Sequence, residues 1–198
     1  MFAQVIQGKV ADEAGLRSAE ERWMRECAPG ATGWLGSTSG ITDDGTFIGV
    51  VRFASEEAAR RNSERPEQDA WWSDAAKCFD GEVTFRDSSD VTTWLAGGSD
   101  DAGFVQVIQG HFRRPERMRA MMEEHSAQLQ EMRPEIIGGT VVMLAGGEYV
   151  QTVYFTSEAE ARERESVAPP AEVAELMAEE LQDATFYDLH HPAMMSPS

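Results

Sequence analysis

Phe2-Ala3-Gln4-Val5-Ile6-Gln7-Gly8 opens the chain, and Phe104-Val105-Gln106-Val107-Ile108-Gln109-Gly110 opens its second half, 102 residues later. At the same spacing, Phe53-Ala54-Ser55-Glu56 meets Phe155-Thr156-Ser157-Glu158. A self-similarity at one fixed offset, held over most of the chain, is the signature of a tandem repeat. The sequence therefore predicts two copies of one structural unit.

Each copy has the same predicted order of strands and helices. Apolar runs and alternation indicate strands, apolar residues at helical spacing indicate helices, and Gly or Pro separates them. In the first copy the strands are predicted at 2–8, 33–40, 47–54 and 82–86, with helices at 12–28 and 56–79, the second interrupted at Pro66. In the second copy they are predicted at 103–110, 136–144, 149–156 and 184–189, with helices from Pro115 and Glu158, the latter broken at Pro169-Pro170. The order β-α-β-β-α-β is the ferredoxin-like unit.

The predicted boundaries follow from the repeat. Residues 1–87 form the first repeat, 88–103 a linker, 104–191 the second repeat and 192–198 a tail. The glycines and acids of 97–101 predict a flexible connection, whereas Trp94-Leu95 is expected to pack against the protein. The tail is expected to be disordered or loosely docked.

A four-stranded sheet with two helices on one face leaves its other face bare. Here that face is too apolar to remain in water, so it needs a cover. The two repeats can supply it for one another. The predicted fold class is α+β, with two ferredoxin-like repeats packed sheet to sheet as an intrachain α/β barrel.

Composition narrows the possible partners. The formal net charge of −18 opposes binding to nucleic acid or to anionic lipid. No apolar run reaches the roughly 20 residues that span a bilayer, and no secretory leader is recognised at Phe2. Cys27 and Cys78 have neither a disulfide pattern nor a metal spacing, so reduced thiols in a cytoplasmic protein without a metal site are expected.

One family shares these motifs. Pro29-Gly30, Asp43-Asp44-Gly45 and the run Val50-Val51-Arg52-Phe53-Ala54-Ser55-Glu56-Glu57-Ala58 resemble the antibiotic biosynthesis monooxygenase (ABM)-like family of the dimeric α/β-barrel superfamily. The second copy resembles it through Gly146-Gly147 and the run Val153-Tyr154-Phe155-Thr156-Ser157-Glu158-Ala159. In that family two single-copy chains usually form the barrel, so this chain is expected to be a monomeric pseudo-dimer or a homodimer of it.

The resemblance implies a range of activities. Members include cofactor-independent oxygenases of aromatic polyketides, haem-degrading enzymes and isomerases. The haem-degrading members carry an axial histidine on the second helix, but 56–80 and 158–182 contain no histidine here. We therefore expect no cofactor, and the partner implied is a hydrophobic or aromatic small molecule.

Three residues are candidates for catalysis. His125 lies on an apolar helical stripe and could act as a base between helix and sheet, or be a core histidine bonded to a backbone carbonyl. Arg52 and Tyr154 occupy matching positions on the third strand of each copy, on the face opposite Val51 and Val153. Arg52 could hold an anionic oxygen, or pair with an acid across the sheet interface.

Five residues are candidates for ligand binding. Gln4 and Gln106 lie mid-strand among apolar residues and could bond one another or point into a cavity. Trp71 and Trp72 lie on the second helix of the first copy, and Trp23 occupies the position of His125. The second copy has Val173 and Ala174 in place of the two neighbouring tryptophans, so the copies have diverged and at most one pocket is expected to be active.

Two functions remain open from the sequence. One is a cofactor-independent monooxygenase or isomerase acting on an aromatic or polycyclic molecule. The other is a non-catalytic small-molecule-binding or stress-related barrel protein. The sequence does not decide whether the chain is an enzyme.

Overall fold

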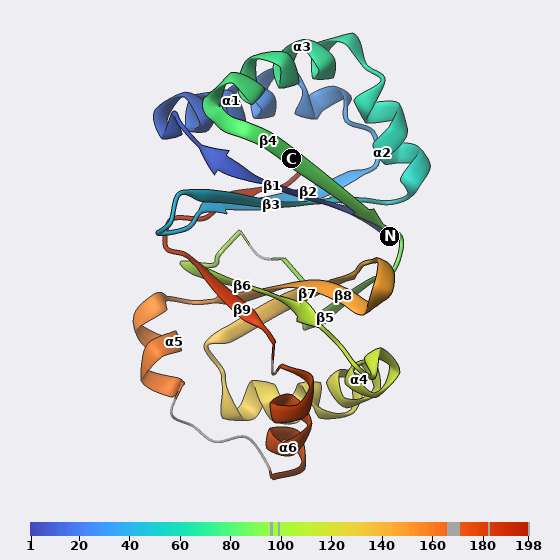
Figure 1. Ribbon diagram of the computed structural model, residues 1–198, viewed down its shortest axis with the longest axis vertical. Coiled ribbons are helices and arrows are strands. Elements are labelled where there is room, and N and C mark those ends of the chain that lie inside the picture. The colour runs from blue at the N-terminus through green and yellow to red at the C-terminus, as the bar shows by residue number, and fades with distance from the viewer. Residues whose placement is uncertain (96, 99, 166–170, 182, 198) are drawn as a thin grey trace. The chain divides into compact units, whose positions relative to one another are not determined.

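The structure is a computed structural model that describes residues 1–95, 97–98, 100–165, 171–181 and 183–197 (Figure 1). The chain forms two units, and each is built on one five-stranded antiparallel sheet. The first unit contains residues 1–89 and 193–198, and the second contains residues 90–192. The predicted α+β class and the two ferredoxin-like repeats are confirmed, while the sheet-to-sheet packing of the repeats stays a prediction.

The first unit has the strand order β10-β2-β3-β1-β4. Its strands are β1 (Phe2–Val10), β2 (Trp34–Ile41), β3 (Thr46–Phe53), β4 (Phe79–Ser88) and β10 (Ala193–Met195). Its helices are α1 (Glu13–Glu26), α2 (Glu56–Ser63) and α3 (Pro66–Ala75), and they cover one face of the sheet (Figure 1). Pro66 opens α3 at a first-turn position, where its missing N–H costs nothing.

The second unit has the equivalent order β5-β7-β8-β6-β9. Its strands are β5 (Val91–Leu95), β6 (Phe104–His111), β7 (Ile136–Met143), β8 (Glu148–Phe155) and β9 (Thr185–Leu189). Its helices are α4 (Pro115–Met132), α5 (Glu158–Arg164) and α6 (Ala171–Glu180), again on one face of the sheet (Figure 1). The predicted break at Pro169-Pro170 lies outside the described residues.

The two sheets share local details. Phe2 pairs with Phe53 in one, and Phe104 pairs with Phe155 in the other. In both sheets the pairing register shifts near the start of the second strand of the repeat. The shift lies between Trp34 and Gly36 in β2, and between Ile136 and Gly138 in β7. For these three strands of each unit, the internal repeat read from the sequence is therefore a repeat of pairing register as well.

The linker and the tail differ from the prediction. Each contains a short strand: β5 pairs with β7 from within the linker 88–103, and β10 pairs with β2 from within the tail 192–198. Val91-Thr92-Thr93 is rich in β-branched residues, which suit a sheet edge. Of the flexible stretch predicted at 97–101, residue 99 lies outside the described residues.

The helix-facing side of each sheet holds the apolar core. In the first unit Phe2, Trp34 and Phe53 pack against Trp23 of α1. In the second unit the core includes Phe104, Phe112, Tyr149 and Phe155. Burial raises the pKa of the Cys27 and Cys78 thiols, which keeps them protonated. No helix among the described residues is both long and apolar enough to cross a membrane.

Tyr149 carries a buried hydroxyl without a hydrogen-bond partner among the described residues. Its ring is 1% exposed and stacks on Phe112, with the ring centroids 3.7 Å apart. Burial raises the pKa of Tyr149 to about 12. The first repeat has Phe47 at the equivalent position.

Tyr149→Phe is therefore expected to raise the free energy of unfolding by about 1 kcal/mol, because a buried unpaired hydroxyl is removed and the ring stack is kept. Chemical denaturation measures this. The matched control is Tyr154→Phe: the Tyr154 hydroxyl accepts a hydrogen bond from Thr152 Oγ1 at 3.2 Å, so its removal should destabilise the protein. A loss of stability in Tyr149→Phe would contradict the account of this core.

Candidate ligand-binding cavity

The second unit contains a cavity of about 350 Å³ between its sheet and its helices. This volume lies at the lower end of the range of small-molecule sites. Much of the wall comes from five methionines of α4 and α6, which are Met118, Met121, Met122, Met132 and Met177. Methionine is unbranched and polarisable, so such a wall adapts to apolar ligands of different shape.

The equivalent space in the first unit is only about 100 Å³. Trp23, Trp71 and Trp72 lie along it. Trp23 and Trp71 meet edge to face with ring centroids 6.4 Å apart, and the Trp71 and Trp72 rings are 6.0 Å apart. At the repeat spacing the second unit has His125, Val173 and Ala174 instead, so the loss of three indoles explains the larger cavity.

The two cavities also differ at the position of one acidic side chain. Glu20 lines the small cavity and accepts a hydrogen bond from Ser39 Oγ. Burial raises the pKa of Glu20 in spite of that hydrogen bond. The repeat spacing places Met122 at this position in the second unit, where it lines the larger cavity. The second cavity is therefore larger, and it has an apolar side chain where the first has a partly buried acid.

The edge strand of each sheet contributes a wall residue. Trp94 of β5 pairs with Gly139 and lines the large cavity, while Met195 of β10 pairs with Ser37 and lines the small one. A Cβ atom at Gly139 would lie 2.1 Å from the Trp94 indole. Only glycine at position 139 leaves room for the indole in this place.

His125 lies midway along α4 and lines the large cavity. Its Nδ1 is 3.2 Å from Oε1 of Gln128, one turn further on, which also lines the cavity. This contact orients the ring, and it is a hydrogen bond to the amide oxygen in the tautomer that carries its proton on Nδ1. In that tautomer the free electron pair lies on Nε2.

Gln106 and Gln4 occupy equivalent sites in their own units. Gln106 Nε2 donates to Asp188 Oδ1 at 2.9 Å, and Gln4 Nε2 donates to Asp87 Oδ1 at 2.9 Å. Gln106 lines the large cavity and Gln4 the small one. Each glutamine thus donates a hydrogen bond to an aspartate of its own unit and lies on the wall of the cavity in that unit.

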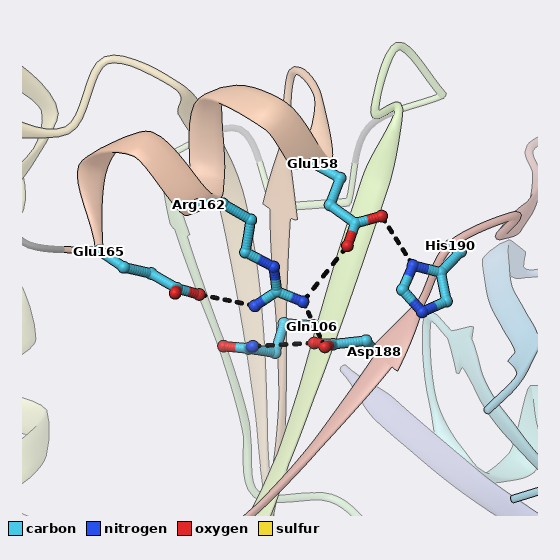
Figure 2. A network of polar contacts seen from close by, with 6 residues as sticks. All are labelled: Gln106, Glu158, Arg162, Glu165, Asp188 and His190. Carbon is cyan, nitrogen blue, oxygen red and sulfur yellow. Dashed lines mark hydrogen bonds and ion pairs between the residues drawn. The ribbon is translucent and has the colours of Figure 1, made fainter. Parts of the chain in front are cut away.

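Asp188 connects Gln106 to a larger network of polar side chains in the second unit (Figure 2). Arg162 of α5 donates to Asp188 Oδ2, to Glu165 Oε1 at 2.6 Å and to Glu158 Oε1 at 3.3 Å. Hydrogen bonds to Glu165 and Asp188 raise the pKa of the Arg162 guanidinium. The hydrogen bond from His190 Nδ1, at 2.7 Å, holds the pKa of Glu158 below its usual range.

Arg52 and Tyr154 line neither cavity among the described residues. Along β3 and β8 they alternate with Val51 and Val153, which do line the cavities, so they lie on the face turned away from the helices. The thickness of a sheet therefore separates Tyr154 from His125. The structure brings His125 and Gln106 to one cavity, and Gln4, Trp23, Trp71 and Trp72 to the other.

Sequence reasoning missed Trp94, Asp188 and Arg162 as parts of the site. The β-branched run before Trp94 is a strand signal that could have placed it on a sheet edge. No signal in the sequence pairs Asp188 with Gln106, because their separation along the chain reflects only the register of β6 with β9. Over the described residues, no cluster of three or more histidine, cysteine or acidic side chains is placed to hold a metal ion.

Solved structures share this two-repeat fold. A proposed monooxygenase from Lactobacillus acidophilus NCFM is 13% identical, with a TM-score of 0.77 over 100% of this chain and 96% of that one. An anthrone oxidase-like protein is 12% identical, with a TM-score of 0.64 over 98% of this chain and 92% of that one.

A third is a ferredoxin-fold protein from Listeria monocytogenes 4b F2365, described as related to antibiotic biosynthesis monooxygenases. It is 10% identical, with a TM-score of 0.51 over 95% of this chain and 94% of that one. No protein-family model and no curated protein sequence matches the chain. The resemblance to ABM-like proteins that the sequence predicted is confirmed at the level of the fold, including the tandem arrangement of two repeats.

Proposed function

We propose that the chain is a cofactor-independent monooxygenase of the ABM type, and that it acts on an aromatic small molecule in the cavity of its second repeat. One observation supports this most: the second repeat has an apolar cavity of about 350 Å³ with His125 on its wall, where the first repeat is filled by tryptophan. The names of the structures with the same fold point in the same direction.

In the proposed reaction His125 Nε2 removes a proton from an electron-rich substrate such as an anthrone. The resulting carbanion gives one electron to O2, the two radicals join as a peroxide anion, and this anion takes the proton back from His125 to become a hydroperoxide. Loss of water from the hydroperoxide leaves a ketone, so the CH2 group and O2 become C=O and H2O. The largely apolar wall limits the access of water to the anion, and Gln128 orients the imidazole.

Oxygen uptake with an anthrone tests this proposal. We expect turnover by the full chain, and in His125→Ala a fall in rate of about 10²–10⁴-fold with little change in substrate affinity. The matched control is His191→Ala, since His191 is exposed and lines neither cavity. Unchanged turnover in His125→Ala would remove His125 from the proposed chemistry.

A second candidate is a binding protein without catalysis. The methionine-rich wall favours it, because flexible methionine side chains can adapt to apolar ligands of different shapes. Binding of anthrones without any oxygen uptake across a substrate panel would select this function over the monooxygenase.

A further inference from the structure

The amide of Gln106 has a fixed orientation. Its partner, the Asp188 carboxylate, can only accept hydrogen bonds, so the amide nitrogen must be the end that faces Asp188. The amide oxygen is then the end turned away from Asp188, on a side chain that lines the cavity (Figure 2). Among the described residues, the hydrogen bond to Asp188 is the one that the Gln106 side chain makes, so its oxygen accepts none.

Asp188 is itself held in place. Arg162 binds its second oxygen, and the same guanidinium lies 5.2 Å from the centroid of the Phe104 ring. Glu158 and Glu165 take the remaining sides of the guanidinium. A planar cation with partners on three sides leaves Asp188 little freedom to rotate, so the orientation of the Gln106 amide is built in before any ligand arrives.

The charged side chains on the wall of the cavity are already paired. Glu165 accepts from Arg162, and Arg133 donates to the buried Glu135. An anionic ligand would therefore have to break one of these pairs to gain a cation. The wall favours a neutral ligand.

The other neutral polar groups on the wall do not select a ligand in the same way. His125 and Gln128 bond one another. The Gln151 side chain makes no hydrogen bond to the described residues, so its amide can present either end to a ligand. Gln106 alone among these amides is held by a carboxylate so that it presents an acceptor.

We infer that Gln106 is a specificity-determining residue: its oxygen selects neutral ligands that carry a hydroxyl or N–H donor, and Asp188 and Arg162 act as positioning residues for it. This inference rests on the proposed function, since it concerns the same cavity. The volume also bounds the ligand. A cavity of about 150 Å³ holds one benzene ring, so about 350 Å³ suits two or three rings.

The first repeat offers a matched comparison. Gln4 and Asp87 make the same hydrogen bond at the same length, but beside a cavity of only about 100 Å³. Arg60, at the position equivalent to Arg162, pairs with Glu64 instead of reaching the strand. A change at Gln4 should therefore leave ligand binding unaffected.

Two naphthalenes test the inference on the full chain at pH 7. Calorimetry should show 2-naphthol, which has a hydroxyl donor, binding about five- to tenfold more tightly than 2-methoxynaphthalene, which has none. Gln106→Met removes the acceptor at similar volume and should bring the two affinities together. Gln4→Met should keep the wild-type ratio.

Asp188→Asn tests the positioning role. An asparagine at this place can donate as well as accept, so the Gln106 amide is free to turn over. The preference for 2-naphthol should fall, while the affinity for 2-methoxynaphthalene stays the same; a purely structural role would lower both affinities together.

The outcomes are distinguishable. Equal wild-type affinities for the two compounds would overturn the inference and leave the cavity as a binding site. A preference that survives Gln106→Met, or that is lost in Gln4→Met, would also overturn it. If neither compound binds the wild-type chain, both the inference and the proposed site are wrong.

Discussion

Trp23→Ala is expected to lower the free energy of unfolding of the first unit by about 3–5 kcal/mol, the usual cost of truncating a buried large aromatic residue. The Trp23 side chain is 6% exposed and meets Trp34 edge to face, with ring centroids 4.7 Å apart. Its Nε1 donates to Gln68 Oε1 at 2.7 Å, and in the variant that oxygen would keep only the longer hydrogen bond from Asn62 Nδ2, at 3.3 Å. The variant would therefore gain a cavity and lose one partly buried hydrogen bond.

Tryptophan fluorescence during urea unfolding measures this loss, because Trp34, Trp71 and Trp72 remain in the first unit of the variant. Glu21→Ala is the matched control on the same helix, where the side chain is exposed and a change within about 0.5 kcal/mol is expected. A loss below about 1 kcal/mol in Trp23→Ala would mean that the indole does not fill the first repeat as described.

His125→Trp is expected to abolish ligand binding by the second repeat. The first repeat carries a tryptophan, Trp23, at the equivalent position. The substitution therefore adds an indole to the wall of the larger cavity and should fill much of it, as in the first repeat. We expect the affinity for 2-naphthol to fall at least about 100-fold, which corresponds to about 2.7 kcal/mol. The fold should be retained, since α1 accommodates an indole at the same place.

Calorimetric titration measures that affinity, and circular dichroism checks the fold. Glu124→Trp adds the same side chain at an exposed neighbouring position, and it should bind 2-naphthol as the wild type does. Undiminished binding in His125→Trp would place the ligand outside the cavity of the second unit.

The repeat made the fold predictable. Because the strand at residue 2 and the strand at residue 104 share their sequence, the order of elements in one copy supports the order in the other. The edge strands β5 and β10 were missed for a physical reason. A strand of five or three residues has little pattern of its own, and it forms because an unpaired neighbour offers hydrogen bonds.

The site was only partly predictable. The exchange of Trp71 and Trp72 for Val173 and Ala174 can be read from the sequence, and the two cavities do differ in volume; that at most one of them is active stays a prediction. Strand alternation placed Arg52 and Tyr154 on the face opposite their valine neighbours, but it does not tell which face borders a cavity. That is fixed by the side on which the helices pack, which depends on contacts far apart in the chain.

The polar partners of the site were beyond reach of sequence reasoning. Asp188 meets Gln106 through the register of two strands, and Arg162 meets Asp188 because one helix crosses the end of one strand. Neither contact follows from local spacing. The same holds for Trp94, whose place depends on the absence of a side chain at Gly139.

The central claim is that the second repeat holds the ligand and the first repeat is filled. Its most direct test uses the five tryptophans as reporters, since Trp94 lies in the second unit on the cavity wall and the other four lie in the first unit. The chain is labelled with 5-fluorotryptophan, the Trp94 signal is assigned with Trp94→Phe, and 2-naphthol is titrated while fluorine NMR spectra are recorded. We predict that the Trp94 signal shifts with saturation while the other four stay in place; shifts in those four with Trp94 unchanged would contradict the account.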